Sequence, residues 1–238
     1  MKSITLPRQP EMSYKLAETF GIVGAILQNS GQFFEEVRAG VDLSGKIKAL
    51  LIVNAIFLAL YGAALGLGHP LQTMSAALKL PVVFMGSLLI CIPTLYIFDV
   101  LLGSKRSLSQ TVVIMLAALA VIATLLFSFV FITVAFRLAI NGYQFFNLLN
   151  AAFVLIALLV GLIYLERGLR LTMLDDIGYG PRNILLYACW IVMFLLVLCQ
   201  MAWSLRPFFH YPGAPFLLLA GSNNFFTQIG PAVSGPQY

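Results

Sequence analysis

The chain has 238 residues, of which 61% are hydrophobic and only 10% are charged. Ordinary soluble domains carry roughly 25% charged residues, so this composition excludes a water-soluble fold and indicates a protein whose outer surface faces lipid. The formal charge of +5 comes from 14 Lys and Arg against 9 Asp and Glu. Because the basic residues stand beside the hydrophobic runs and form no patch interleaved with aromatics, they indicate membrane topology and contact with lipid headgroups, not nucleic-acid binding.

The N-terminal region precedes the hydrophobic runs. Residues 1–12 are polar and contain two prolines and Glu11, which predicts an extended tail without the apolar stretch of a cleavable signal peptide. Residues 13–39 place apolar side chains near helical spacing, but glycines and charged residues interrupt them too often for a span. We expect one or two amphipathic helices here, lying either on the membrane surface or against the protein's own loops.

Five hydrophobic runs follow, and each is close to the ~20 residues that a hydrocarbon core requires. In the second run, Pro81 is expected in the first turn, where its missing N–H costs nothing. Pro93 falls in the middle of that run and should kink it. Asn141-Gly142 indicates a tight turn after the third run. The runs cover residues 49–68, 81–102, 111–136, 145–165 and 184–204.

Basic residues predict the orientation of these spans. With five spans, the segments on the N-terminal side of the membrane hold 11 basic residues, against 3 on the other side. We expect a protein of the bacterial inner membrane, and the positive-inside rule predicts that its N-terminus is cytoplasmic and its C-terminus extracytoplasmic. The 11 are Lys2, Arg8, Lys15, Arg38, Lys46, Lys48, Lys105, Arg106, Arg167, Arg170 and Arg182, and the 3 are Lys79, Arg137 and Arg206.

The expected fold class is all-α: a polytopic transmembrane bundle of about five helices with an amphipathic N-terminal surface region. Residues 1–45 form the cytoplasmic tail and interfacial helices, and residues 46–205 the five-span transmembrane domain. Residues 206–238 form an extracytoplasmic tail whose five prolines exclude one long helix. Its aromatic side chains suit the bilayer interface, a partner surface, or the protein's own helix ends.

Few polar residues fall within the spans. Asp99 lies about one turn from the end of the second span and can reach Lys105 or Arg106, while its proximity to Pro93 keeps a functional role open. Asn147 and Asn150 share one face of the fourth span. Such residues usually join helices by hydrogen bonds, and the alternative is that they line a small pocket.

Small residues recur at four-residue spacing in the first and fourth spans. This pattern lets helix backbones approach closely, either within the protein's own bundle or against a neighbouring subunit. We expect these residues, with Asn147 and Asn150, to form helix-packing or partner faces. They are Ala55, Ala59, Gly62, Ala63, Gly66, Ala157 and Gly161.

Catalytic and metal-binding patterns are not found. The only histidines, His69 and His210, lie beyond the predicted span ends and are expected to be interfacial, so neither haem nor metal ligation is predicted. No nucleophile elbow, metalloprotease helix or phosphate loop occurs. We therefore expect a protein that is not an enzyme, and the sequence assigns no cofactor, because lipids and pigments can pack on such helices without polar side chains.

Five spans after a cytoplasmic segment resemble the YIP-domain family of five-span membrane proteins. Two segments are also similar to an uncharacterised group of bacterial multi-span proteins. The first is residues 49–105, with Tyr61-Gly62 and the Pro93…Tyr96 pattern. The second is the tail, with Trp203, Arg206-Pro207-Phe208, Pro215-Phe216 and Asn224-Phe225-Phe226. The resemblance implies membrane organisation and partner recruitment, without a catalytic activity.

These features predict a non-catalytic integral membrane scaffold or accessory subunit of a larger membrane-protein complex. Its expected partners are membrane lipids and other integral membrane proteins. The alternative is a transporter or channel for a neutral or apolar solute, with Pro93, Asp99, Asn147 and Asn150 near the path. A third interpretation, a lipid-binding or membrane-shaping protein, rests on the amphipathic N-terminal region.

Overall fold

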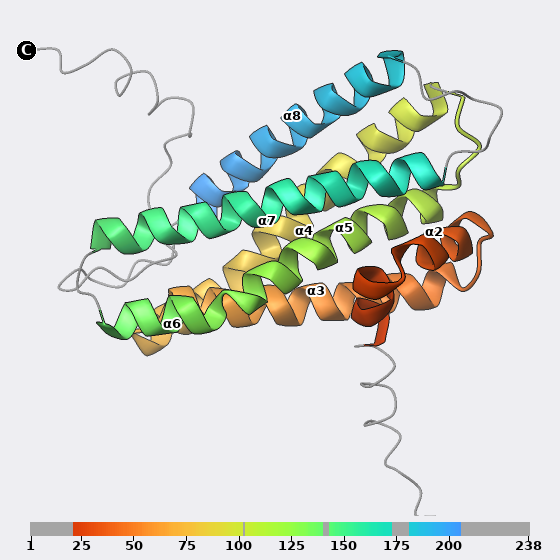
Figure 1. Ribbon diagram of the computed structural model, residues 1–238. Coiled ribbons are helices and arrows are strands. Elements are labelled where there is room, and N and C mark those ends of the chain that lie inside the picture. Colours follow the sequence, from red (N-terminus) through yellow and green to blue (C-terminus); the bar gives the residue numbers. More distant parts are fainter. Residues whose placement is uncertain (1–20, 102, 140–142, 173–180, 206–238) are drawn as a thin grey trace, which may run out of the picture.

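The computed structural model describes residues 21–101, 103–139, 143–172 and 181–205, and every element within them is a helix (Figure 1). The all-α class is thereby confirmed. The C-terminal tail, which was predicted to be extracytoplasmic, and the predicted turn at Asn141-Gly142 lie outside the described residues. A helical segment over residues 21–28 is followed by α2 (Ser30–Arg38), α3 (Leu43–Leu65), α4 (Pro70–Leu101), α5 (Leu108–Ser128), α6 (Val130–Ala139), α7 (Tyr143–Leu171) and α8 (Pro181–Leu205).

Five of the described helical stretches are long and apolar enough to cross a membrane, which confirms the predicted number of spans. In the third, α5 and α6 follow each other and together cover Leu108–Ala139. The others are Leu43–Leu65, Pro70–Leu101, Phe145–Leu171 and Leu185–Leu205. The chain is therefore a helical membrane protein.

The second span differs from its prediction, because α4 begins at Pro70 and Pro81 lies in its interior. Pro70 can begin the helix because its missing N–H would have no acceptor in the first turn. The hydroxyl of Thr73 donates to the carbonyl oxygens of Gly66 and His69, at 2.9 and 3.1 Å, and holds the chain between α3 and α4. Lys79, predicted to lie in a loop, is consequently a buried residue of α4.

The third span was predicted as one continuous run, but the helix is interrupted at Phe129. Thr124 Oγ1 donates to the carbonyl oxygen of Ala120, and Ser128 Oγ donates to that of Thr124. Such bonds from a side chain to the preceding turn bend helices. The N–H of Phe129 is shared between the carbonyl oxygens of Leu125 and Leu126, so the regular pattern of helical hydrogen bonds is interrupted here.

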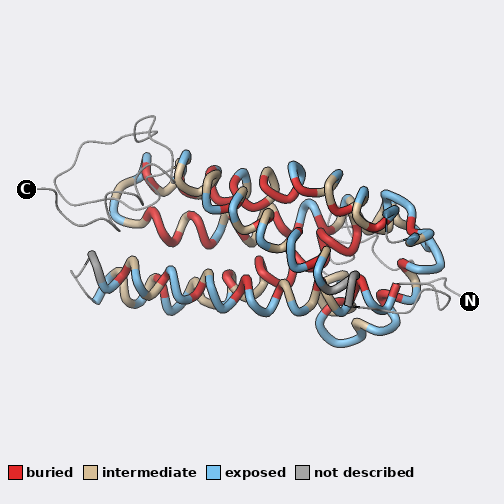
Figure 2. Tube along the Cα trace, turned by 90° about the horizontal axis from the view of Figure 1, so that it is seen from above, coloured by how far each residue is buried: buried red, intermediate tan, exposed pale blue. Residues whose placement is uncertain are grey.

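α5 is the central helix of the bundle. Every residue from Val113 to Ala123 is buried, as expected of a helix that is apolar all round. α3 packs against both α4 and α5, α7 packs on α5, and α8 packs on α4. In Figure 2 the buried residues face the middle of the bundle and the exposed ones its outer surfaces. α7 and α8 therefore rest on two neighbouring helices, since α4 and α5 also contact each other.

Glycines of the small-residue faces lie where two backbones meet. A Cβ on Gly62 would overlap the backbone carbonyl of Ala76 in α4, and one on Gly66 would lie 2.7 Å from the Cα of Thr73. A Cβ on Gly161 of α7 would overlap the side chain of Ile122 in α5. These three glycines therefore serve the protein's own helix packing.

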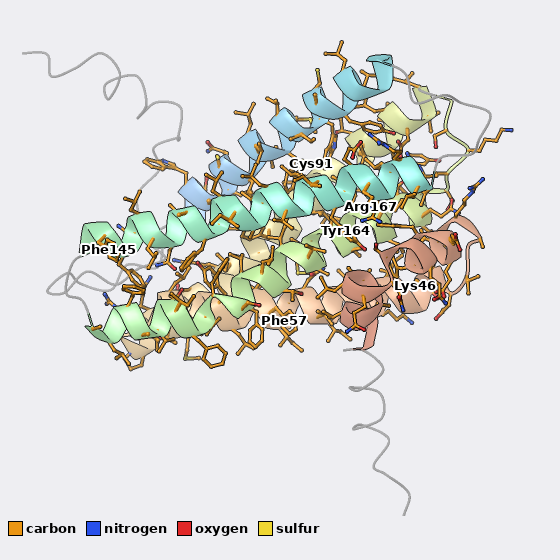
Figure 3. The ribbon with its side chains drawn as sticks, in the orientation of Figure 1. Lys46, Phe57, Cys91, Phe145, Tyr164 and Arg167 are labelled. Atoms are coloured by element: carbon orange, nitrogen blue, oxygen red, sulfur yellow. The ribbon has the colours of Figure 1, made fainter. Side chains whose placement is uncertain are left out.

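The N-terminal region packs on the bundle through α2. Phe33, Phe34 and Val37 are buried, and α2 contacts α5 and α7. The ring of Phe34 lies 5.2 Å from that of Tyr164, whose position on α7 beside α2 is labelled in Figure 3. The part of this region that the structure describes thus packs on the protein itself, and the surface that α2 meets is formed by helices, not by the loops that were expected.

Candidate functional site

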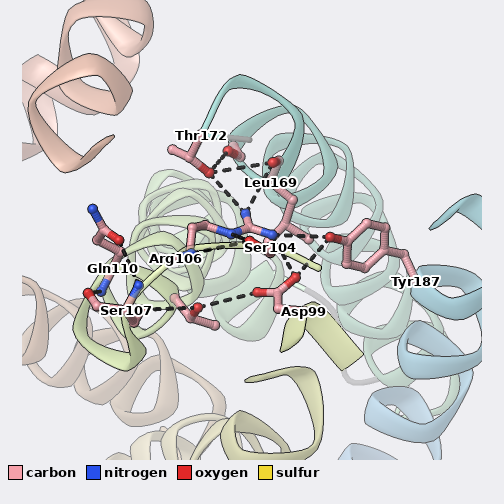
Figure 4. A network of polar contacts seen from close by, with 10 residues as sticks. Asp99, Ser104, Arg106, Ser107, Gln110, Leu169, Thr172 and Tyr187 are labelled. Carbon is pink, nitrogen blue, oxygen red and sulfur yellow. Dashed lines mark hydrogen bonds and ion pairs between the residues drawn. The ribbon is translucent and has the colours of Figure 1, made fainter. Parts of the chain in front are cut away.

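A buried polar network surrounds Asp99 where α4 and α7 end and where α5 and α8 begin; we call this the Asp99 end of the bundle (Figure 4). Asp99 Oδ1 accepts from Arg106 Nη2 at 2.6 Å and from the hydroxyl of Tyr187 at 2.9 Å. Asp99 Oδ2 accepts from the hydroxyl of Thr111 at 3.3 Å. Asp99 therefore forms an ion pair with Arg106, which is one of the two basic residues predicted to be within its reach.

Arg106 extends the network to the end of α7. Its Nη1 donates to the carbonyl oxygen of Leu169 at 3.1 Å and to the hydroxyl of Thr172 at 2.9 Å. Its Nε donates to Ser104 Oγ at 3.2 Å. Groups from α4, the end of α7 and α8 therefore meet around one guanidinium group, which joins three helices, and Thr111 of α5 is joined to them through Asp99.

The turn between α4 and α5 brings Arg106 back to Asp99. The N–H of Gly103 donates to the backbone carbonyl oxygen of Val100, and the N–H of Ser104 donates to the backbone carbonyl oxygen of Asp99. These two bonds form a Schellman motif at the end of α4. Gly103 has a φ of 81°, a left-handed conformation that glycine adopts without penalty. Ser107 and Gln110 then form a reciprocal capping box that begins α5.

A second polar cluster lies near the opposite end of the bundle, which we call the Asn150 end. Asn150 Oδ1 accepts from the hydroxyl of Tyr61 at 2.9 Å and from that of Thr133 at 3.1 Å. Asn150 Nδ2 donates to the carbonyl oxygen of Phe146 at 2.8 Å. This amide joins α3, α6 and α7 by hydrogen bonds, which is the usual role predicted for it.

A groove of about 370 Å³ lies between α7 and α8, with α4 also contributing to its walls. The side chains that line it are apolar except for Asn147 and Asn150. Asn147 Oδ1 is buried and has no hydrogen-bond partner among the described residues. The other lining residues are Leu65, Leu80, Val83, Phe84, Ala151, Val154, Leu155, Leu158, Leu198, Cys199 and Ala202.

The four polar or proline positions predicted near a solute path are not brought together. Asn147 and Asn150 line the groove, whereas Pro93 and Asp99 do not. Asp99 belongs to the network at the other end, and Pro93 lies inside α4. Near Pro93, the indole N–H of Trp190 donates to the carbonyl oxygen of Cys91 at 3.1 Å and links α8 to α4.

Sequence reasoning missed most of the Asp99 network. Tyr187, Thr111 and Thr172 look like ordinary polar residues in or beside apolar helices, and their nearness to Asp99 depends on how the helices pack. Arg106 was counted as a topology signal and was named, with Lys105, as a residue within reach of Asp99, but its burial was not predicted. The signal that could have revealed the burial is Asp99 itself, since a lone buried carboxylate needs a cation.

No group of three or more His, Cys, Asp or Glu side chains in the described part of the chain is placed to hold a metal ion. By their length and composition, the five apolar helices assign the chain to the class of helical membrane proteins. No protein-family model matches the chain, and no curated protein or solved structure matches it either. The resemblance to YIP-domain proteins therefore stays a prediction.

Proposed function

We propose that the protein is a non-catalytic accessory subunit or scaffold that binds a membrane-spanning helix of another integral membrane protein. The single observation behind this proposal is the apolar groove between α7 and α8. Within lipid, helices associate through close van der Waals packing, because lipid tails are as apolar as the side chains themselves. A gap in packing along the bundle is therefore the place where a partner helix gains contacts.

The residues of the groove suit a helix more than a compact ligand. Ala151 on α7 and Cys199 and Ala202 on α8 are small, so a neighbouring backbone can approach between them. Leu155, which is 58% exposed, lines the same groove and offers a large apolar contact. Only 22% of the α8 span is buried within the protein, compared with 67% for the span formed by α5 and α6.

The charges at the Asp99 end support a structural role for the membrane domain. Asp99 and Arg106 neutralise each other, and their neighbours occupy both carboxylate oxygens with hydrogen bonds. Transporters that move ions or protons usually keep an ionisable group available to the pathway. A carboxylate that is neutralised by Arg106 and hydrogen-bonded to side chains of α5 and α8 favours a fixed scaffold over a carrier.

A second candidate function is binding or passage of a neutral solute through the same groove. It is favoured by Asn147, whose buried Oδ1 accepts no hydrogen bond from a described residue and would accept one from a hydroxyl or amide of a ligand. Solute flux into proteoliposomes that is abolished by Asn147→Leu, while Asn54→Leu leaves it intact, would establish this function and displace the scaffold proposal.

Photo-crosslinking in the native membrane tests the accessory-subunit proposal. A photoreactive amino acid at position 202, in the groove, should yield one discrete crosslinked membrane protein. The matched control is the same photoreactive amino acid at Val82 of α4. Val82 is 45% exposed and stands next to Val83, which lines the groove, but Val82 itself does not line it. Identical crosslinking patterns at the two positions would refute a specific partner in the groove.

A further inference from the structure

Asn147 lines the groove between α7 and α8 but makes no hydrogen bond with a described residue. Asn150, which shares its helix face, makes three such bonds. We propose that Asn147 selects the partner helix by donating a hydrogen bond to a side-chain oxygen of a Ser, Thr, Asn or Gln residue in that helix. This inference rests on the proposed function, because it concerns the helix that occupies the groove.

The two polar atoms of the Asn147 amide differ in their exposure. Oδ1 is buried without a hydrogen-bond partner among the described residues. Nδ2 also donates to none of these residues, but it does not belong to the buried atoms that lack a partner, so it is accessible from the groove. The rest of the lining is apolar apart from Asn150, whose oxygen already accepts two hydrogen bonds. The acceptor that Nδ2 lacks is therefore one that an occupant of the groove supplies.

The position of Asn147 along α7 determines where the partner carries its polar residue. Asn147 is the third residue of the candidate span Phe145–Leu171, so with the rise of an α-helix its backbone lies about 3 Å inside the end of that span. Deeper along the same helix, the groove is lined by the apolar residues Ala151, Val154 and Leu158. A matching partner helix therefore has its polar residue in the outermost turn of its own span and apolar residues below it.

The lining of the groove favours a helix with such a residue over one that is wholly apolar. Ala151 on α7 and Ala202 on α8 are small, so a neighbouring backbone comes close and a short polar side chain reaches the amide. A wholly apolar helix would cover the Asn147 N–H without offering an acceptor, and burying an unpaired amide costs free energy. The groove thus distinguishes between partner helices by a penalty as well as by a contact.

Thermal unfolding of the purified chain in detergent tests whether Asn147 has a role in the fold itself. Asn147→Leu should keep the melting temperature of the unmodified protein, because no hydrogen bond to a described residue is lost. Asn150→Leu should lower it, because three hydrogen bonds are lost. A loss for Asn147→Leu as large as that for Asn150→Leu would show that Asn147 serves the protein's own packing and would overturn the proposal.

Recovery of the partner tests the hydrogen bond. In a mild-detergent pull-down from native membranes, Asn147→Leu should lower the amount of recovered partner about threefold or more, which is the factor for an average hydrogen bond between membrane helices. Ser204→Ala is the matched control, since Ser204 is exposed on α8 outside the groove and its hydroxyl donates to Gln200 of the same helix. It should leave the recovery unchanged.

A photoreactive amino acid at position 151, one turn from Asn147, identifies the contact. The crosslinked peptide of the partner should hold a Ser, Thr, Asn or Gln within one turn of the linked residue. Replacing that residue with Leu in the partner should cause no further loss of recovery with Asn147→Leu. Full recovery with Asn147→Leu would overturn this inference and leave the proposed function standing, whereas crosslinking to phospholipid alone would overturn both.

Discussion

Asp99 Oδ1 and Arg106 Nη2 lie 2.6 Å apart, and the side chains of both residues are almost wholly buried, at 1% and 3% exposed. The seven-residue separation spans the turn from α4 to α5, so the pair closes that turn. Tyr187, Thr111 and Thr172 complete its hydrogen bonds from other helices. The pair therefore determines how the helices meet at this end of the bundle.

Asp99→Asn should destabilise the protein strongly, because it leaves the Arg106 charge buried without a counterion. Breaking a buried pair by removing one partner costs about 3–5 kcal/mol. Thermal or denaturant unfolding of the purified protein in detergent measures this change. Glu166→Gln is the control, since it breaks the exposed Glu166–Arg170 pair within one helix, whose contribution is about 0.3–0.5 kcal/mol. Similar losses for the two variants would contradict the structural role of the pair.

Gly62→Ala should destabilise the packing of α3 on α4, because the added methyl would overlap the Ala76 carbonyl, which is backbone and cannot rotate away. Overpacking of this kind costs about 1–3 kcal/mol. Gly86→Ala is the matched control, since its Cβ would meet only the flexible end of Met201, at 3.3 Å. It should be neutral or stabilising by up to ~1 kcal/mol through helix propensity. Equal stability of the two variants in a thermal unfolding assay would rule out a close α3–α4 contact at Gly62.

The sequence predicted the spans well because hydropathy and length decide them almost alone. It misplaced Pro81, since a proline beside an apolar run is a good helix start, whereas the helix begins at Pro70. Near-continuous hydropathy through Phe129 also concealed the break in the third span, which depends on the local bonds of Thr124 and Ser128.

The candidate sites were harder to predict, because they depend on which helices become neighbours. The same-face spacing of Asn147 and Asn150 was sufficient to associate them with one pocket or interface. Tyr61 and Thr133 could not be assigned to Asn150 without knowing that α3 and α6 pack beside α7. For the same reason the small residues left two packing partners open, and Gly62 and Gly161 turned out to pack within the bundle.

Tyr61→Phe should destabilise the Asn150 end modestly. It removes the hydroxyl donor to Asn150 Oδ1, which still accepts from Thr133, so the loss should be near the ~0.6 kcal/mol average for hydrogen bonds between membrane helices. Asn150→Leu should cost more, because it strands the buried hydroxyls of both Tyr61 and Thr133. Denaturant unfolding checks this ranking, and a larger loss for Tyr61→Phe than for Asn150→Leu would show that Asn150 is not the centre of the cluster.

The reactivity of Cys199 measures access to the groove, and Cys91 and Cys189, which do not line it, serve as references. A lipophilic maleimide should label Cys189 and Cys199, which are exposed, faster than Cys91, which is fully buried. Ala151→Trp should slow labelling of Cys199, because both residues line the groove, and should leave Cys189 unchanged. Peptide-level mass spectrometry measures the rates. Equal slowing at Cys189 and Cys199 would indicate a global change instead of a filled groove.

The most direct test of the central claim is a mild-detergent pull-down of the tagged protein from its own membrane, with quantitative mass spectrometry of what elutes. We expect a stoichiometric membrane-protein partner that is lost in Ala151→Trp and retained in Ala152→Trp. Ala152 is exposed on the same helix but lies outside the groove. Elution of the protein alone, or loss of the partner in both variants, would contradict a partner helix bound between α7 and α8.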